Sequence, residues 1–257
     1  MWDCIGPELA GPDQGAAGLT LVGVGPGDPH LLTVAAVRAI QAAAVVAYPV
    51  ARPEAEGMAA RIAAPWLGEH QRRLPLVFPM VEGAEPRQRA WRAAADGLAA
   101  EVAAGHAVVL LCEGDVSLYA SASYVLLALR QRHPDCPLRL IPGITAVAAA
   151  AAAAAWPLVL QQEPLLIRPT PQSPVELEAL LQQAKETEAV LALLKLGARW
   201  SWVRPLLEKR GLLEASLFAR RVGWSDQLLC PGEQVPAEDA PYFSLLLIRQ
   251  GWPPVLP

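Results

Sequence analysis

Three short glycine-bearing stretches carry the residues of this chain that could hold a small ligand. They are GVGPGD at residues 23–28, EGDVSLY at 113–119 and IPGITA at 141–146. Glycine has no side chain, so a ligand can approach the main chain closely at such positions. The stretches also contain carboxyl groups, which accept hydrogen bonds and can accept a proton during catalysis. These carboxyl groups belong to Asp28, Glu113 and Asp115.

A dinucleotide-binding loop is the first alternative for residues 23–28. Gly23 and Gly25 match the first two glycines of the G-x-G-x-x-G pattern, but Asp28 occupies the position of the third. A carboxylate there would repel a pyrophosphate, which disfavours a dinucleotide site. A tight strand-to-helix turn without any ligand is a second alternative, and this stretch alone does not decide between a turn and a ligand site.

Each stretch follows a predicted buried strand, at 20–24, 107–111 and 138–141. Ligands of open parallel sheets bind beyond the carboxyl ends of the strands, so we expect the three loops to line one cleft. Thr145 can cap the alanine-rich helix that follows it and offer a hydroxyl to a ligand. Asp115 can accept hydrogen bonds or cap the next helix, and for both residues capping alone is the alternative.

The elements predicted around these strands indicate an α/β fold in two parts. A loose N-terminal extension at 1–18 precedes an N-terminal α/β domain at 19–142 and a C-terminal α/β domain at 143–257. From Trp156 onward the strands look antiparallel or mixed. The predicted helices are 33–44, 54–66, 87–104, 121–132, 175–185 and 202–210, and the other predicted strands are 45–48, 74–78, 164–167, 189–194, 217–222 and 242–249.

Composition excludes several classes of function. The chain is 53% hydrophobic, enough for a sizeable core, and its net charge of −4 argues against a nucleic-acid-binding platform. The four cysteines and four histidines show no metal-ligand spacing. This favours a protein that lacks a metal site and resides in the reducing cytoplasm. No signal peptide is apparent, and the alanine-rich run at 146–155 is too short to span a membrane.

The three stretches, in this order, resemble the tetrapyrrole methylases, which methylate porphyrinoids with S-adenosylmethionine. WPL at 156–158 and LLKLG at 193–197 extend the resemblance, although Leu194 replaces a common methionine. The resemblance covers nearly the whole chain after residue 18. It implies the class III fold of S-adenosylmethionine-dependent methyltransferases: two α/β domains with the methyl donor in the cleft between them, usually as a homodimer.

Within this family the chain looks most like the precorrin-2 C20-methyltransferases of cobalamin synthesis. The resemblance rests on VAYP at 46–49, LVFPM at 76–80, Trp91 and the EGDVS form of the second loop. It implies methylation of precorrin-2, or of its cobalt-containing counterpart, at C20. The alternatives are a uroporphyrinogen-III methylase, a later precorrin methylase, a relative acting on diphthamide or ribosomal RNA, and a non-catalytic binding protein on the same fold.

The resemblance also implies roles for individual residues. The substrate would lie over the opening loop, near Gly25, Gly27 and Asp28, and its carboxylates need cations. The base that removes the proton is not assigned; Asp28, Glu113 and Asp115 are its candidates. The residues implied near S-adenosylmethionine are Pro26, Glu113, Gly114, Asp115, Leu118, Thr145, Ala146 and Leu194. The arginines in suitable regions are Arg87, Arg89, Arg92, Arg168, Arg220 and Arg221.

Overall fold

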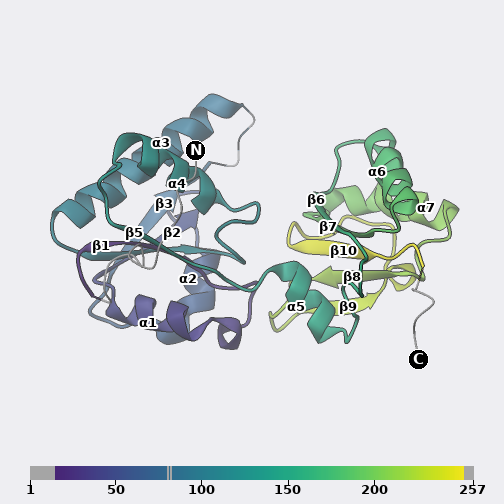
Figure 1. The fold of residues 1–257 in the computed structure, drawn as a ribbon, viewed down its shortest axis with the longest axis horizontal. Coiled ribbons are helices and arrows are strands. Elements are labelled where there is room, and N and C mark those ends of the chain that lie inside the picture. Colours follow the sequence, from purple (N-terminus) through teal and green to yellow (C-terminus); the bar gives the residue numbers. More distant parts are fainter. Residues whose placement is uncertain (1–14, 80, 82, 252–257) are drawn as a thin grey trace. The chain divides into compact units, whose positions relative to one another are not determined.

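The structure, a computed structural model, describes residues 15–79, 81 and 83–251. It divides into two α/β units, the first ending at Thr145 and the second beginning at Ala146 (Figure 1). The predicted domain division, after Pro142, falls in the same connection. Most of the predicted extension and Met80 lie outside the described residues, and the first strand begins at Gly18.

The first unit contains a five-stranded sheet in which every pairing is parallel, in the order β3-β2-β4-β1-β5. Gly23, at the end of β1, pairs with Cys112 at the end of β4, and Val22 pairs with Ile141 at the end of β5. The loops that follow these three adjacent strands therefore start side by side. The strands are β1 (Gly18–Gly23), β2 (Val45–Val50), β3 (Arg72–Val77), β4 (Ala107–Cys112) and β5 (Leu138–Ile141).

Helices cover both faces of this sheet (Figure 1). The helices α3 (Ala84–Ala103) and α4 (Ser121–Arg132) bury Leu98 and Leu129 against Leu21 and Leu110 of the strands. The other face is covered by α1 (Val34–Ala42) and α2 (Met58–Ala63). Thr33 accepts a hydrogen bond from the backbone N–H of Ala36 at 3.1 Å and so caps α1. The short helices η2 (Pro29–Leu31) and η3 (Ala64–Trp66) complete the unit.

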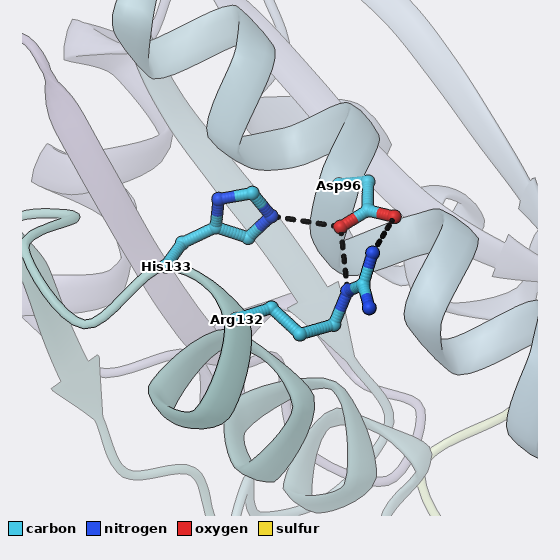
Figure 2. A network of polar contacts seen from close by, with 3 residues as sticks. All are labelled: Asp96, Arg132 and His133. Carbon is cyan, nitrogen blue, oxygen red and sulfur yellow. Dashed lines mark hydrogen bonds and ion pairs between the residues drawn. The ribbon is translucent and has the colours of Figure 1, made fainter.

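A polar network joins α3 to the end of α4 (Figure 2). Both carboxylate oxygens of Asp96 accept hydrogen bonds from the Arg132 guanidinium at 2.8 Å, and His133 Nε2 lies 2.7 Å from one of them. The hydrogen bonds from Arg132 and then from His133 lower the pKa of Asp96 to about 2. The three side chains are about one-third or more exposed, so solvent screens the network and its stabilising effect is modest.

The second unit contains a mixed five-stranded sheet in the order β6-β7-β10-β8-β9. Parallel pairing joins β6 to β7, and antiparallel pairing joins β10 to both its neighbours and β9 to β8. This confirms the mixed character predicted from the sequence. The strands are β6 (Leu165–Pro169), β7 (Val190–Leu194), β8 (Ser216–Arg220), β9 (Leu228–Pro231) and β10 (Ser244–Ile248).

The helices α6 (Pro174–Glu186) and α7 (Trp200–Lys209) cover one face of the second sheet, and α5 (Ala146–Ala153) lies on the other (Figure 1). The Trp200 ring packs 5.0 Å from that of Phe218, centroid to centroid. The short helix η4 (Gly197–Arg199) precedes α7, and the short helix η5 (Gly232–Gln234) follows β9. No helix among the described residues is long and apolar enough to cross a membrane.

Candidate functional site

The loops after β1 and β4 pair with each other at the carboxyl edge of the first sheet. The backbone N–H of Gly114 donates to the carbonyl of Gly25 at 2.8 Å, and Gly25 donates back to Gly114 at 3.2 Å. Both residues have left-handed backbones, with φ values of +76° and +66°. Only glycine adopts this conformation without strain, so the pairing depends on both glycines.

The loop after β5 packs against these two loops through Gly143. A Cβ atom added to Gly143 would lie 2.1 Å from the carbonyl oxygen of Gly114, and one added to Gly23 would lie 2.5 Å from the backbone nitrogen of Gly143. The three loops therefore meet main chain against main chain, with no room for a side chain at either position.

Asp115 joins the second loop to the third. One carboxylate oxygen accepts a hydrogen bond from the backbone N–H of Gly143 at 2.9 Å, and the other accepts from the N–H of Ser117 at 2.9 Å and from its hydroxyl. Burial acts to raise the pKa of Asp115, but these hydrogen bonds outweigh it and lower the pKa. The alternative that Asp115 caps the next helix is wrong, because α4 is preceded by Ala120 and has no side-chain cap.

The neighbouring carboxyl group, on Glu113, contacts a different element. Its Oε1 atom accepts a hydrogen bond from the backbone N–H of Ala59, in the first turn of α2, at 3.1 Å. Burial raises the pKa of Glu113, and backbone hydrogen bonds, including that from Ala59, only partly offset this. Glu113 therefore keeps its proton to a higher pH than an ordinary glutamate.

Asp28 forms a local turn at the end of the first loop. Its carboxylate caps η2 and accepts a hydrogen bond from the backbone N–H of His30 at 2.8 Å. This bond is the main cause that lowers the pKa of Asp28. Asp28 is thus ionised at neutral pH with 40% of its side chain exposed. Gly27, the residue that precedes Asp28, is buried, and Pro26 is partly buried.

The structure brings together the predicted residues of the first unit, namely Gly25, Glu113, Gly114 and Asp115. Thr145 ends that unit, and Ala146 opens α5. The other predicted residues lie on the same loops, at Pro26, Gly27, Asp28 and Leu118.

Leu194 is the predicted donor contact in the second unit. It ends β7, and its carbonyl accepts hydrogen bonds from the backbone N–H of Thr170 at 2.7 Å and from the Thr170 hydroxyl at 2.8 Å. Leu194 is partly buried.

The candidate arginines fall into two groups. Arg87, Arg89 and Arg92 lie on the exposed side of α3, where Arg87 donates to the carbonyl of Gly83 and Arg89 pairs with Glu85. The second group lies in or beside the second sheet, with Arg168 exposed in β6, Arg220 at the end of β8 and Arg221 just after it.

Two residues of these loops were not predicted from the sequence: Gly143, which packs the third loop against the other two, and Ser117, which contacts the Asp115 carboxylate. The glycine of IPGITA follows a predicted strand, as the glycines of the other loops do, and that position was the available signal for Gly143. The role of Ser117 depends on how the loop folds back on Asp115 and has no signal in the sequence.

No group of three or more His, Cys, Asp or Glu side chains gathers to hold a metal ion within the part of the chain that the structure describes. Space does open beside the second loop: a Cβ atom added to Gly114 would have no heavy atom of the described residues within 4 Å. A ligand can therefore reach the main chain of this loop.

Together, a parallel sheet with three converging glycine loops and a separate mixed sheet define an α/β protein of two units. Residues 18–233 match the family described as Tetrapyrrole (Corrin/Porphyrin) Methylases. The chain belongs to this family, whose methyl donor is S-adenosylmethionine.

Three relatives match most of this chain. A precorrin-2 C(20)-methyltransferase of Sinorhizobium sp is 32% identical, covering 93% of this chain and 97% of its own length. A cobalt-precorrin-2 C(20)-methyltransferase of Salmonella typhimurium is 30% identical, and the match covers 91% of this chain and 97% of the relative's length. The cobalamin biosynthesis protein CobIJ of Mycobacterium tuberculosis is 34% identical over 90% of this chain, which spans only 45% of CobIJ.

Solved structures share the fold. The methyltransferase CobJ has a TM-score of 0.64 and 25% identity, covering 91% of this chain and 94% of its own. A uroporphyrin-III C-methyltransferase of Thermus thermophilus in complex with S-adenosylhomocysteine has a TM-score of 0.59 and 21% identity. The match covers 90% of this chain and 97% of that structure's chain.

Proposed function

We propose that this protein transfers a methyl group from S-adenosylmethionine to carbon C20 of precorrin-2, or of cobalt-precorrin-2, in cobalamin biosynthesis. Two relatives that match along almost their full length are named for these two reactions. The structural observation that carries the proposal is the meeting of three glycine loops, held by the hydrogen bond between Asp115 and Gly143. We further propose that the enzyme is cytoplasmic and acts as a homodimer.

The loop residues bind and orient the donor. S-adenosylmethionine supplies a methyl group activated on a sulfonium, and transfer to carbon is an in-line displacement. Orientation can contribute about 7–11 kcal/mol to such a reaction, so a rigid main-chain cradle suits it. The proposed donor contacts are Pro26, Glu113, Gly114, Asp115, Leu118, Thr145 and Ala146 of the loops and Leu194 at the end of β7.

The substrate is proposed to lie over Gly25, Gly27 and Asp28, and the carbon that accepts the methyl group must then lose a proton. Among the candidate bases, Asp115 is the least suited because both its oxygens are held by loop hydrogen bonds. Asp28 is ionised and partly exposed, and Glu113 has a raised pKa, which brings it closer to neutral pH. We propose one of these two as the proton acceptor.

The test is methyl transfer to enzymatically made precorrin-2, followed by mass spectrometry. The expected product is one methyl group heavier, with the new group at C20 by carbon NMR. Cobalt-precorrin-2, uroporphyrinogen III and later precorrins form the comparison panel. Methylation of one of these but not of precorrin-2 or its cobalt form would contradict the substrate. Absence of S-adenosylhomocysteine binding in calorimetry would favour a non-catalytic binding protein and contradict the whole proposal.

A further inference from the structure

One edge of the second sheet gathers the ends of strands that run in the same direction. Both β7 and β8 pair antiparallel with β10, which lies between them, so their carboxyl ends flank the start of β10. In this register Leu194 pairs with Leu245, and Arg220 pairs with Ser244. The backbones of the residues just after β7 and β8 are therefore about two strand spacings, or about 10 Å, apart.

Two cationic residues at this edge have a left-handed backbone conformation, which residues other than glycine rarely adopt. Lys195, the first residue after β7, has a φ of +59°, and Arg221, the first after β8, has a φ of +48°. Arg199 donates to the carbonyl of Lys195 at 2.9 Å, and the N–H of Arg221 donates to the carbonyl of Phe243 at 2.8 Å. Backbone strain that is held in place by neighbouring contacts is typical of functional sites.

Further cationic and aromatic groups lie at the same edge. The Nε atom of Arg220 is buried, and among the described residues it has no hydrogen-bond partner. The ammonium of Lys195 lies 5.8 Å from the ring centroid of Tyr242, whose ring packs edge-on against that of Phe243. Tyr242 and Phe243 are 45% and 43% exposed, which is unusual for large aromatic residues.

The cations at this edge contact both a carboxylate and aromatic rings. Asp226 accepts a hydrogen bond from Arg221 Nε at 2.8 Å, and the Arg221 guanidinium also lies over the Trp224 ring at 5.1 Å. Lys195 contacts an aromatic face, and the buried Arg220 Nε atom can still donate. A group that is both anionic and flat would match this combination, because carboxylates accept hydrogen bonds from guanidinium and ammonium groups and a conjugated ring packs on exposed aromatics.

We propose that Lys195, Arg220, Arg221, Tyr242 and Phe243, here called the cationic edge, bind the peripheral carboxylates and ring edge of the tetrapyrrole. The inference rests on the proposed function, and it assigns substrate recognition to Lys195, which lies in the LLKLG stretch and has no role assigned from the sequence. The same carboxylate chemistry could come from the donor, whose amino-acid end also carries a carboxylate. The experiment separates these two sources.

The test compares Lys195→Asn with Lys195→Arg. Asparagine tolerates a left-handed backbone, so Lys195→Asn keeps the turn while it removes the charge. We expect this variant to raise the KM for the tetrapyrrole about tenfold and to leave the Kd for S-adenosylhomocysteine unchanged, and Lys195→Arg to restore the KM. Lys209→Gln is the matched control, because it removes an exposed lysine from the last turn of α7 and should change neither constant.

Equilibrium binding keeps this inference separable from the proposed function. Uroporphyrin III, a stable tetrapyrrole polycarboxylate, is titrated into each variant with tryptophan fluorescence as the signal. If the wild-type enzyme methylates no tetrapyrrole, the proposed function fails, and weaker uroporphyrin binding by Lys195→Asn alone still supports the cationic edge. Unchanged tetrapyrrole binding in this variant overturns the inference, and so does a loss confined to S-adenosylhomocysteine.

Discussion

The carboxylate of Asp115 accepts a hydrogen bond from the backbone N–H of Gly143 at 2.9 Å, although α4 and β5 separate the two residues along the chain. This bond ties the loop after β4 to the loop after β5. Because Gly114 of the same loop also pairs with Gly25, one short segment holds all three loops together. Changes at this junction should therefore affect both folding and donor binding.

Asp115→Ala should weaken S-adenosylhomocysteine binding and destabilise the protein by about 1–3 kcal/mol, since it removes the acceptor of the partly buried Gly143 N–H and of the Ser117 contacts. Calorimetry and urea unfolding measure the two effects. Ser117→Ala is the control, because it keeps the bond between Asp115 and Gly143 and should bind the donor product normally. Wild-type affinity in Asp115→Ala would contradict a role for this bond in the site.

Gly143→Ala should destabilise the first unit by about 1–3 kcal/mol or more, because the new methyl group would meet backbone atoms of Gly114 and Gly23. Thermal unfolding and donor-product binding should both show the loss. Gly97→Ala is the matched control: Gly97 lies within α3, and an added Cβ meets no described heavy atom within 4 Å. That variant should be stabilised by about 0.5–1 kcal/mol. Equal behaviour of the two variants would show that the loops are not packed main chain to main chain.

Glu113→Gln should alter the pH dependence of stability. The pKa of Glu113 is raised in the folded protein above the usual 4.5. Its favourable contribution to the free energy of unfolding is therefore fully present below pH 4.5 and is lost as the pH rises through the folded-state pKa. The glutamine keeps an acceptor for the N–H of Ala59 and cannot ionise. Its stability relative to wild type, measured by urea unfolding, should therefore increase as the pH rises above about 4.5.

The control for this series is Glu56→Gln, at an exposed residue 3.7 Å from Arg61, which should show little change with pH. A Glu113→Gln variant that loses stability relative to wild type as the pH rises would mean that Glu113 is stabilised as a carboxylate.

Asp96→Asn should give the opposite pH dependence. Hydrogen bonds from Arg132 and His133 lower the pKa of Asp96 from 3.8 to about 2, so the stabilisation is present above 3.8 and is lost as pH falls toward 2. The variant should be slightly less stable than wild type at pH 7, and the difference should shrink below pH 4. Glu85→Gln, in the looser pair with Arg89, should match wild type throughout. A difference that persists unchanged to low pH would exclude an electrostatic origin.

Much of the fold could be predicted because its signals are local. The helix at 121–132 and the strand at 138–141 have the predicted bounds. Thr33 and Ser173, of residue types that favour the start of a helix, cap α1 and α6 through side-chain hydrogen bonds. The predicted helix at 54–66 is shorter. Gly57 lies against the ring of Tyr48, α2 spans only six residues after it, and η3 replaces the last turn around Pro65.

Features without a clear local sequence pattern could not be predicted. The strand β9 is a four-residue edge strand that ends at Pro231, so its pattern is too short to distinguish it from a loop. The hydrogen bond from Gly143 decides the role of Asp115, and contacts from Arg199 and Phe243 hold the backbones of Lys195 and Arg221. Sequence periodicity reveals none of these contacts.

A crystal structure with S-adenosylhomocysteine tests most directly whether the converged loops form the donor site. The loops predict that the ligand contacts the main chain of residues 113–115 and lies beside Gly114, with the bond between Asp115 and Gly143 intact. Ligand bound away from these loops, or loops separated from one another in the complex, would contradict that site.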